Sequence, residues 1–141
     1  MTVLDIAAVA RASGLPASAL RYYEEKRLIA SVGRRGLRRL FDAEVLTRLR
    51  LIALGRAAGF SLAEIAAMFA ADGRLRIDRK ALTARAEALD VTIRQLRALA
   101  RGLRHAAACP APSHLECPHF RRLLLAAGQG LIAAPGARRR R

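Results

Sequence analysis

The chain has 141 residues, a length that fits one compact domain or a small head joined to a long helix and that excludes a large multi-domain enzyme. Its 26 Lys and Arg residues outnumber its 11 Asp and Glu residues, which gives a formal net charge of +15. Such a basic balance predicts a polyanionic partner, with nucleic acid as the leading expectation. Apolar runs are interrupted by Arg or Asp well before the ~20 residues that span a bilayer, so no membrane-spanning helix is expected.

The N-terminus and the cysteine content indicate the compartment. Residues 1–14 lack the charged start and the continuous apolar stretch of a secretory signal, so we expect the chain to stay in the cytoplasm. The two cysteines, Cys109 and Cys117, are then expected to be free thiols, because a reducing compartment disfavours structural disulfides. Metal binding, redox sensing and packing stay open as their roles.

The first segment has the pattern of two short helices joined by a tight turn. Small and apolar side chains recur at helical spacing over residues 4–11, and Gly14 can adopt the positive φ that ends a helix. Pro16 suits the first turn of the next helix, because its missing N–H would be unpaired there anyway, and residues 17–26 continue with good helix formers. This pattern predicts a helix-turn-helix.

A small β-hairpin, or wing, is predicted between residues 28 and 42, where Gly33 and Gly36 punctuate a run that has no helix cap. Helical spacing returns from residue 43 to about residue 59. After this helix, Ser61 and Glu64 form a capping box that begins a helix over residues 62–71. Together these elements predict a mostly α fold with a winged helix-turn-helix head.

A long helix is predicted over residues 78–107. Its apolar residues follow one another in alternating steps of four and three, which is the seam of a coiled coil. The seam consists of Leu82, Ala86, Leu89, Ile93, Leu96, Ala100 and Leu103. A single helix would leave this stripe in water, so we expect two copies of the chain to form a homodimer through it. The alternative is that the stripe folds back onto the head of its own chain.

The last part of the chain differs in composition. Three prolines predict a loop over residues 109–118, and a short helix is expected over residues 120–127. The four terminal arginines, Arg138 to Arg141, are expected to be disordered. The expected division of the chain is a head (1–72), a dimerisation helix (73–108), a cysteine-containing effector loop with a short helix (109–128) and a basic tail (129–141).

Four motifs keep an order and a spacing that resemble the mercury-resistance regulator (MerR) family of bacterial transcription factors. The motifs are residues 6–16 (IAAVARASGLP), 20–26 (LRYYEEK), 36–38 (GLR) and 58–65 (AGFSLAEI). With the long helix, the resemblance covers residues 3–109. It implies an antiparallel dimer that binds double-stranded promoter DNA, bends and untwists it for RNA polymerase, and switches from repression to activation when an effector binds near the long helix.

The resemblance assigns DNA contacts to the second helix. Arg21 and Tyr22 match the recognition positions, and Ser18 lies one turn before Arg21 on the same face. Tyr23 follows closely, with packing inside the head as its alternative role. Arg can hydrogen-bond to guanine edges or to phosphate, while a Tyr hydroxyl can contact and position the DNA backbone.

Basic residues of the wing are the second set of candidate DNA contacts, with a solvated charge run as the alternative for any one of them. These candidates are Arg34, Arg35, Arg38 and Arg39, with Arg38 at the family's wing position. A weaker candidate is Arg56, which lies just before residues 57–59, at the second wing. The chain also departs from the family. Leu37 and Leu40 stand where family wings carry aromatic residues, and Arg27 stands where the family has Gly, so the family's particular wing contacts do not transfer.

The cysteine loop resembles that of the metal-sensing branch of the family, notably the copper-efflux regulators. In that branch a Cys-Pro, six residues and a second Cys-Pro place two thiolates at the end of the dimerisation helix, a soft pair that suits Cu(I). Arg74 and Leu75 stand where sensors of divalent ions add a third cysteine, so the resemblance favours a monovalent ion.

A tetrahedral Zn(II) site is the other metal hypothesis, because histidines flank the second cysteine. Its ligands would be Cys109, His114, Cys117 and His119. His105 is expected to solvate or cap the last turn of the long helix. Thiol redox sensing, packing and another effector stay open.

Other classes of function fit the residues less well. Three His and scattered carboxylates form no group of nucleophile, base and orienting residue, so no enzyme is expected. An RNA-binding module would present more stacking aromatics than the six Phe and Tyr residues here. We expect a transcriptional regulator on DNA in the bacterial cytoplasm, associated with the nucleoid, and keep effector-independent or redox-responsive DNA binding as the alternative.

Overall fold

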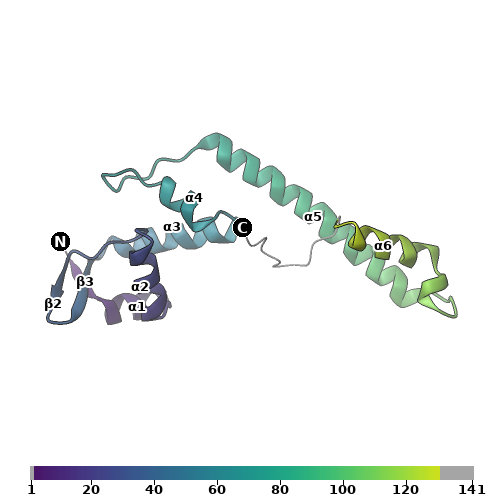
Figure 1. Cartoon of the computed structure of the whole chain (residues 1–141), viewed down its shortest axis with the longest axis horizontal. Helices are drawn as coiled ribbons and strands as arrows, with labels where there is room; N and C mark the ends of the chain where they lie inside the picture. Colours follow the sequence, from purple (N-terminus) through teal and green to yellow (C-terminus); the bar gives the residue numbers. More distant parts are fainter. Residues whose placement is uncertain (1, 131–141) are drawn as a thin grey trace. The chain divides into compact units, whose positions relative to one another are not determined.

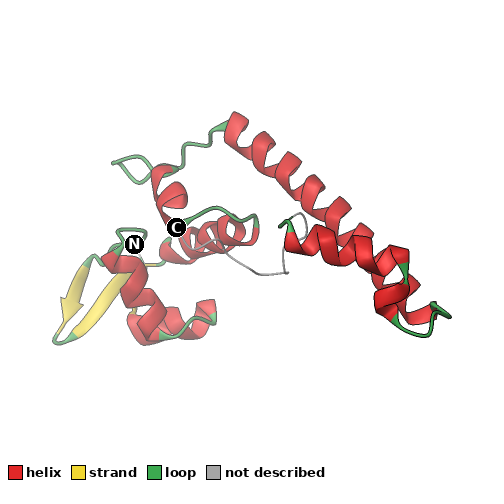
Figure 2. Cartoon of the chain, turned by 45° about the vertical axis from the view of Figure 1, so that its right-hand side comes forward, coloured by secondary structure: helices red, strands yellow, loops and turns green. Residues whose placement is uncertain are grey.

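The computed structural model describes residues 2–130 and is mostly helical (Figures 1 and 2). The chain divides into two compact units, Met1–Arg85 and Ala86–Arg141. Its elements in chain order are β1 (Val3–Asp5), α1 (Ile6–Ser13), α2 (Ala17–Glu25), β2 (Gly33–Arg35), β3 (Arg38–Asp42), α3 (Val45–Ala57), α4 (Leu62–Ala67), α5 (Arg79–Ala108), η1 (His114–Glu116) and α6 (Pro118–Gly128). The expected fold class, a mostly α chain with a helix-turn-helix head, a small antiparallel sheet and a long helix, is confirmed.

Helices α1 and α2 form the predicted helix-turn-helix. Gly14 ends α1 with a φ of 74°, and its N–H donates to the carbonyl of Ala10 at 3.0 Å. A residue with a Cβ is strained at this φ, so glycine sets the tight turn. Pro16 then precedes α2 with an extended backbone.

The three strands form an antiparallel sheet in the order β1-β3-β2. The predicted wing is confirmed as β2 and β3, which pair with Arg34 opposite Arg39. The helix predicted from residue 4 begins at Ile6 instead, because residues 3–5 pair with β3 and Asp5 caps α1 by accepting a hydrogen bond from the Ala8 N–H at 2.8 Å. Three residues are too few to display the period-two alternation of a strand.

One apolar core holds the first unit together, with side chains from α1, α2, the sheet, α3 and α4. Its buried members are Val9, Leu20, Leu28, Ile29, Phe41, Val45, Leu49, Ile52, Phe60 and Ile65. Burying one large apolar side chain stabilises a fold by about 1.5–3 kcal/mol. This core therefore fixes α2 relative to the wing, so that both present their surfaces from one rigid unit.

Helix α4 starts at the predicted capping box. The Ser61 hydroxyl accepts from the Glu64 N–H at 3.1 Å, and the Glu64 carboxylate accepts from the Ser61 N–H at 3.0 Å. The helix ends at Ala67, four residues before its predicted end. Phe69 instead forms a β-bridge with Leu75, and the guanidinium of Arg48 stacks over the Phe69 ring at 3.8 Å, which holds this turn against α3.

In the second unit, α6 lies along the C-terminal part of α5 (Figures 1 and 2). The long helix predicted over residues 78–107 is confirmed as the 30-residue α5. Its interior Gly102 faces α6, and a Cβ there would lie 3.2 Å from the methyl carbons of Leu123. The glycine therefore allows the two helices to approach closely. Helix α6 begins at Pro118, two residues before its predicted start, because proline suits the first turn of a helix.

The predicted loop between α5 and α6 contains the short turn η1, which Ser113 caps by accepting a hydrogen bond from the Leu115 N–H at 3.3 Å. Most of the predicted basic tail over residues 129–141, including Arg138 to Arg141, lies outside the described residues. The four-part division of the chain stays a prediction.

Candidate nucleic-acid interface and thiol cluster

Helix α2 carries three of the sequence-predicted DNA contacts on its surface. Ser18, Arg21 and Tyr22 are exposed, whereas Leu20 of the same helix is fully buried and anchors it. The ammonium of Lys26 lies 5.6 Å from the centre of the Tyr22 ring and adds a second cation beside the phenol. The exposed side of α2 therefore offers cationic and hydroxyl donors of the kind that contact phosphates and base edges.

Tyr23 lies differently from its neighbours on α2. Its side chain is half-buried and packs against the core, and its ring centre is 6.3 Å from that of Tyr22. Its carbonyl accepts from the Leu28 N–H at 2.9 Å, where the chain leaves the helix. The structure thus places Tyr23 in the packing position that the sequence left open.

The wing has exposed arginines on both of its strands. Arg34 and Arg35 of β2 are exposed and form no ion pair within residues 2–130. Arg38 of β3 is also exposed, and its guanidinium lies 3.3 Å from the Asp5 carboxylate. The backbone N–H of Ala8 and, to a smaller degree, the Arg38 guanidinium hold the pKa of Asp5 below its ordinary value. Arg38 therefore joins the wing to β1 while it stays accessible to solvent.

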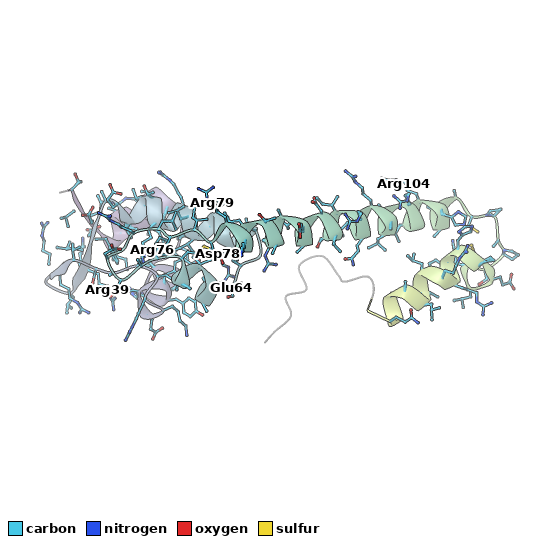
Figure 3. The ribbon with its side chains drawn as sticks, turned by 90° about the horizontal axis from the view of Figure 1, so that it is seen from above. Arg39, Glu64, Arg76, Asp78, Arg79 and Arg104 are labelled. Atoms are coloured by element: carbon cyan, nitrogen blue, oxygen red, sulfur yellow. The ribbon has the colours of Figure 1, made fainter. Side chains whose placement is uncertain are left out.

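Arg39 of β3 is half-buried and forms an ion pair with Glu24 of α2 at 3.2 Å (Figure 3 labels Arg39). This pair ties the wing to the helix that carries Arg21. It fixes the spacing between the two surfaces, and it leaves Arg39 less free than Arg34 or Arg35 to contact a partner. A separation of 15 residues between Glu24 and Arg39 gives no local signal of the pairing in the sequence.

The second turn of the head lies between α3 and α4. Arg56 is half-buried in the last turn of α3, and Gly59 follows with a φ of 94°. The guanidinium of Arg85 in α5 lies over the ring of Phe60, 5.1 Å from its centre. Sequence reasoning did not identify Arg85, because its spacing along α5 gives no hint of a contact with a turn 25 residues earlier. This cation–π contact joins the start of α5 to the head.

A cluster of two thiols and one imidazole lies at the junction of α5 and α6. The ligand atoms of His105, Cys109 and Cys117 lie within 4.8 Å of one another, and the Cys117 Sγ is 3.5 Å from the His105 Nε2. Cys117 is buried, Cys109 is half-buried, and both are free thiols. We call this group the thiol cluster. Two soft sulfurs and one imidazole nitrogen fit a soft or borderline metal ion.

Cys117 is the most perturbed thiol of the cluster. It takes the N-cap position of α6, and the backbone N–H of Phe120, followed by the imidazole of His105, lowers the pKa of its thiol to about 7. Burial acts in the opposite direction but is outweighed. The environment therefore favours a thiolate at Cys117, which is the form that binds metals and attacks oxidants.

The two histidines proposed from the sequence as ligands point elsewhere. The His114 Nε2 lies 2.6 Å from the carbonyl of Ala106, and the His119 Nδ1 lies 3.1 Å from the guanidinium of Arg122. His105 takes their place beside the thiols, although it was expected only to cap or solvate the helix. The missed signal is the His-x-x-x-Cys spacing, which places residue 109, the first residue after α5, about one helical turn beyond residue 105.

The apolar stripe of α5 is exposed within the described chain. Its large members are 39 to 55% exposed, and no residue of α5 is buried. These members are Leu82, Leu89, Ile93, Leu96 and Leu103. Within residues 2–130, no helix is long and apolar enough to cross a membrane.

The short helices, the tight turn and the basic wing define the first unit as the head of a winged helix-turn-helix protein. Models of two segments of one family match the chain: the MerR helix-turn-helix regulatory protein segment over residues 4–72 and the MerR DNA-binding segment over residues 46–106. The chain therefore belongs to the MerR family of helix-turn-helix transcriptional regulators.

Individual relatives agree with this family. An HTH-type transcriptional activator SoxR homolog from Chromobacterium violaceum is 38% identical over 69 residues, which are 49% of this chain and 47% of the relative. The match thus spans about half the length of that relative. The crystal structure of a MerR-family transcriptional regulator from Bacillus cereus has a similar fold, with a TM-score of 0.57 and 19% identity over 92% of this chain and 99% of its own.

Proposed function

We propose that the protein regulates transcription by binding double-stranded promoter DNA through α2 and the wing of its head. The observation that carries the proposal is the exposure of Ser18, Arg21 and Tyr22 on α2, a helix anchored by a core that also fixes the wing. The formal net charge of +15 favours a polyanionic partner. Phosphate contacts from the wing arginines would position the head, and Arg21 would read base edges.

The acting form is proposed to be a homodimer that pairs through α5. The exposed stripe of this helix recurs in steps of four and three, and a second copy of the same stripe would remove it from water. Two heads joined in this way could bend and untwist the DNA between their half-sites, and so act on RNA polymerase at the promoter. The bacterial cytoplasm, at the nucleoid, is the compartment in which this activity would occur.

The thiol cluster is proposed as the effector site, with a soft metal ion such as Cu(I) or Zn(II) as the effector. Its support is the convergence of Cys109 and Cys117 at the end of α5. When bound, such an ion would bridge α5 and α6 and so alter the end of the dimerisation helix. The favoured thiolate at Cys117 supports oxidant sensing as a second candidate. Binding without any effector is the remaining alternative, and loss of both thiols would leave such a protein unchanged.

The test of DNA binding uses duplexes selected by the protein from a random-sequence library, with affinity measured by fluorescence anisotropy. Loss of a base-contacting arginine costs about 1–3 kcal/mol, so Arg21→Ala should weaken binding by roughly 5- to 150-fold. Arg94→Ala, which removes the same charge from an exposed position on α5, should change affinity less than about twofold. Equal losses in both variants would mean that binding follows overall charge, and failure to select any duplex would reject the proposal.

The effector is tested by transcription from a promoter that contains the selected site, with and without Cu(I), Zn(II) or a peroxide. Reduced wild-type protein is compared with the double variant Cys109→Ser plus Cys117→Ser. Transcription that responds in the wild type but not in the double variant supports the thiol cluster as the sensor. An identical output from both proteins under every condition rejects it and favours effector-independent DNA binding.

A further inference from the structure

Three potential ligands, rather than two, meet at the junction of α5 and α6. His105 lies in the last turn of α5, and Cys109 is the first residue after the helix ends at Ala108. The ligand atoms of the two residues lie within 4.8 Å of each other. Cys117 returns to this end of α5 after the loop that contains η1, at the N-cap of α6. The junction of the two helices therefore brings donors from both sides of the loop to one place.

The distances suit a shared ion. Zinc binds His nitrogen at about 2.0–2.1 Å and Cys sulfur at about 2.3 Å, so two such donors in a tetrahedral site lie about 3.6 Å apart. The His105 Nε2 and the Cys117 Sγ are 3.5 Å apart, and all three donor atoms lie within 4.8 Å of one another. Little rearrangement is needed for the three atoms to reach one ion.

The surroundings hold the imidazole of His105 in place, and within residues 2–130 Cys117 is its only polar partner. Its ring lies 4.3 Å from the ring of His119, centre to centre, which limits its rotation, and its one described polar contact is with Cys117. His114 is held by the Ala106 carbonyl, and His119 by Arg122. Of the three histidines, only His105 presents a ring nitrogen to the thiols.

We propose that His105 is a metal ligand together with Cys109 and Cys117, in a site with one nitrogen and two sulfurs that takes a divalent ion of borderline softness such as Zn(II). A linear site for Cu(I) needs only the two thiolates. A third donor beside them instead favours a tetrahedral ion whose fourth position is left for water or another ligand. The inference rests on the proposed effector function only for its consequence in transcription, because metal binding is a property of the chain alone.

Zn(II) affinity of the reduced full chain, measured in competition with a chromophoric chelator, tests the role of His105. The wild type should bind one Zn(II) per chain, and His105→Ala should weaken binding at least about tenfold, since outer-shell changes alone cost about 10–100-fold. His105 is exposed and alanine favours helix, so this variant should keep α5 folded, which circular dichroism checks. His114→Ala is the matched control and should bind Zn(II) as the wild type does, and Cu(I) affinity should be the same in all three proteins.

Cobalt(II) provides a second readout that does not depend on affinity. The wild type should give the visible absorption of tetrahedral Co(II) with a sulfur charge-transfer band from two thiolates. In His105→Cys this band should grow in proportion to three thiolates, because the new thiol occupies the position of the imidazole. Equal Zn(II) affinity in wild type and His105→Ala, or an unchanged Co(II) band in His105→Cys, would overturn the proposal.

These measurements are made without DNA, so they separate this inference from the proposed function. If the chain binds Zn(II) through His105 but selects no duplex, the metal site is supported and the role in transcription is rejected. If the chain selects a duplex but binds no Zn(II), the metal site is rejected and the proposal of DNA binding is supported.

Discussion

Arg27 occupies a backbone conformation that suits glycine better than arginine. It follows α2 with a φ of 60° and is the one non-glycine residue with a positive φ among residues 2–130. The left-handed region costs an L-residue with a Cβ about 1–2 kcal/mol. At this same position the chain departs from the glycine of the family it resembles. The exposed Arg27 side chain adds a cation to the head at the expense of backbone strain.

Arg27→Gly is therefore expected to raise the free energy of unfolding by about 1 kcal/mol, because the strain is released and only part of the gain is offset by the greater freedom of glycine in the unfolded chain. Urea unfolding at one fixed protein concentration measures the change. The neighbouring Lys26→Gly removes the same charge from a residue with a φ of −81°, and it should lower the stability instead. A shift of the same sign in both variants would exclude backbone strain as the cause.

Arg34 and Arg39 face each other across the wing but have different surroundings. Arg34 is exposed, so Arg34→Gln should reduce the slope of log affinity against log salt by about 0.9, the effect of one phosphate contact, and leave stability unchanged. Arg39 is paired with Glu24, so Arg39→Gln should lower the free energy of unfolding by up to about 1 kcal/mol. Salt titrations of duplex binding, together with urea unfolding, distinguish the two variants. If both variants changed the salt dependence and the stability equally, the ion pair with Glu24 would not give Arg39 a role different from that of Arg34.

At the scale of elements, local signals in the sequence account for most of the fold. The glycine that ends α1 and the capping box that starts α4 each act within four residues, so they can be identified without tertiary structure. Strand β1 and the end of α4 depend on partners far along the chain, namely β3 and Arg48. The same limit applies to the thiol cluster. The cysteines were evident from their spacing, but the choice of His105 over the two histidines that are nearer to Cys117 in the sequence depends on how the loop closes.

The capping box makes part of the stability of α4 depend on pH. The backbone N–H and the hydroxyl of Ser61, with a smaller contribution from Arg85, hold the pKa of Glu64 below its ordinary value of 4.5. A lowered pKa in the folded state means that the stabilisation is fully present above about pH 4.5 and is lost as the pH falls through the folded pKa. Glu64→Gln should therefore be less stable than the wild type at neutral pH, and the difference should shrink on acidification.

Urea unfolding between pH 7 and pH 3 measures this difference directly. Glu87→Gln, which neutralises an exposed carboxylate on α5, is the control and should show a smaller dependence on pH. If the difference between wild type and Glu64→Gln stayed constant down to pH 3, the charge of Glu64 would have no part in capping α4.

At the scale of the whole molecule, one chain leaves two features unexplained: an apolar stripe in water and a single DNA-reading head. The proposed dimerisation through α5 would account for both, because it would cover the stripe and supply the second head that a two-fold symmetric site requires. Helix α5 has apolar residues off the stripe as well. Val91 and Ile93 are 43% and 45% exposed, but two residues along a helix are about 200° apart, so only Ile93 lies on the seam.

This pair allows a matched test of the dimer. Ile93→Asp places a charge in the proposed seam, so sedimentation should show a monomer at concentrations where the wild type is a dimer, and binding to a two-fold symmetric duplex should weaken at least tenfold. Val91→Asp introduces the same charge at almost the same exposure on the opposite side of α5, and it should remain dimeric and bind as the wild type does. If both variants stayed dimeric, the subunits would have to associate through another surface. If the wild type were itself a monomer, the stripe would have to pack within its own chain, and each head would have to bind DNA alone.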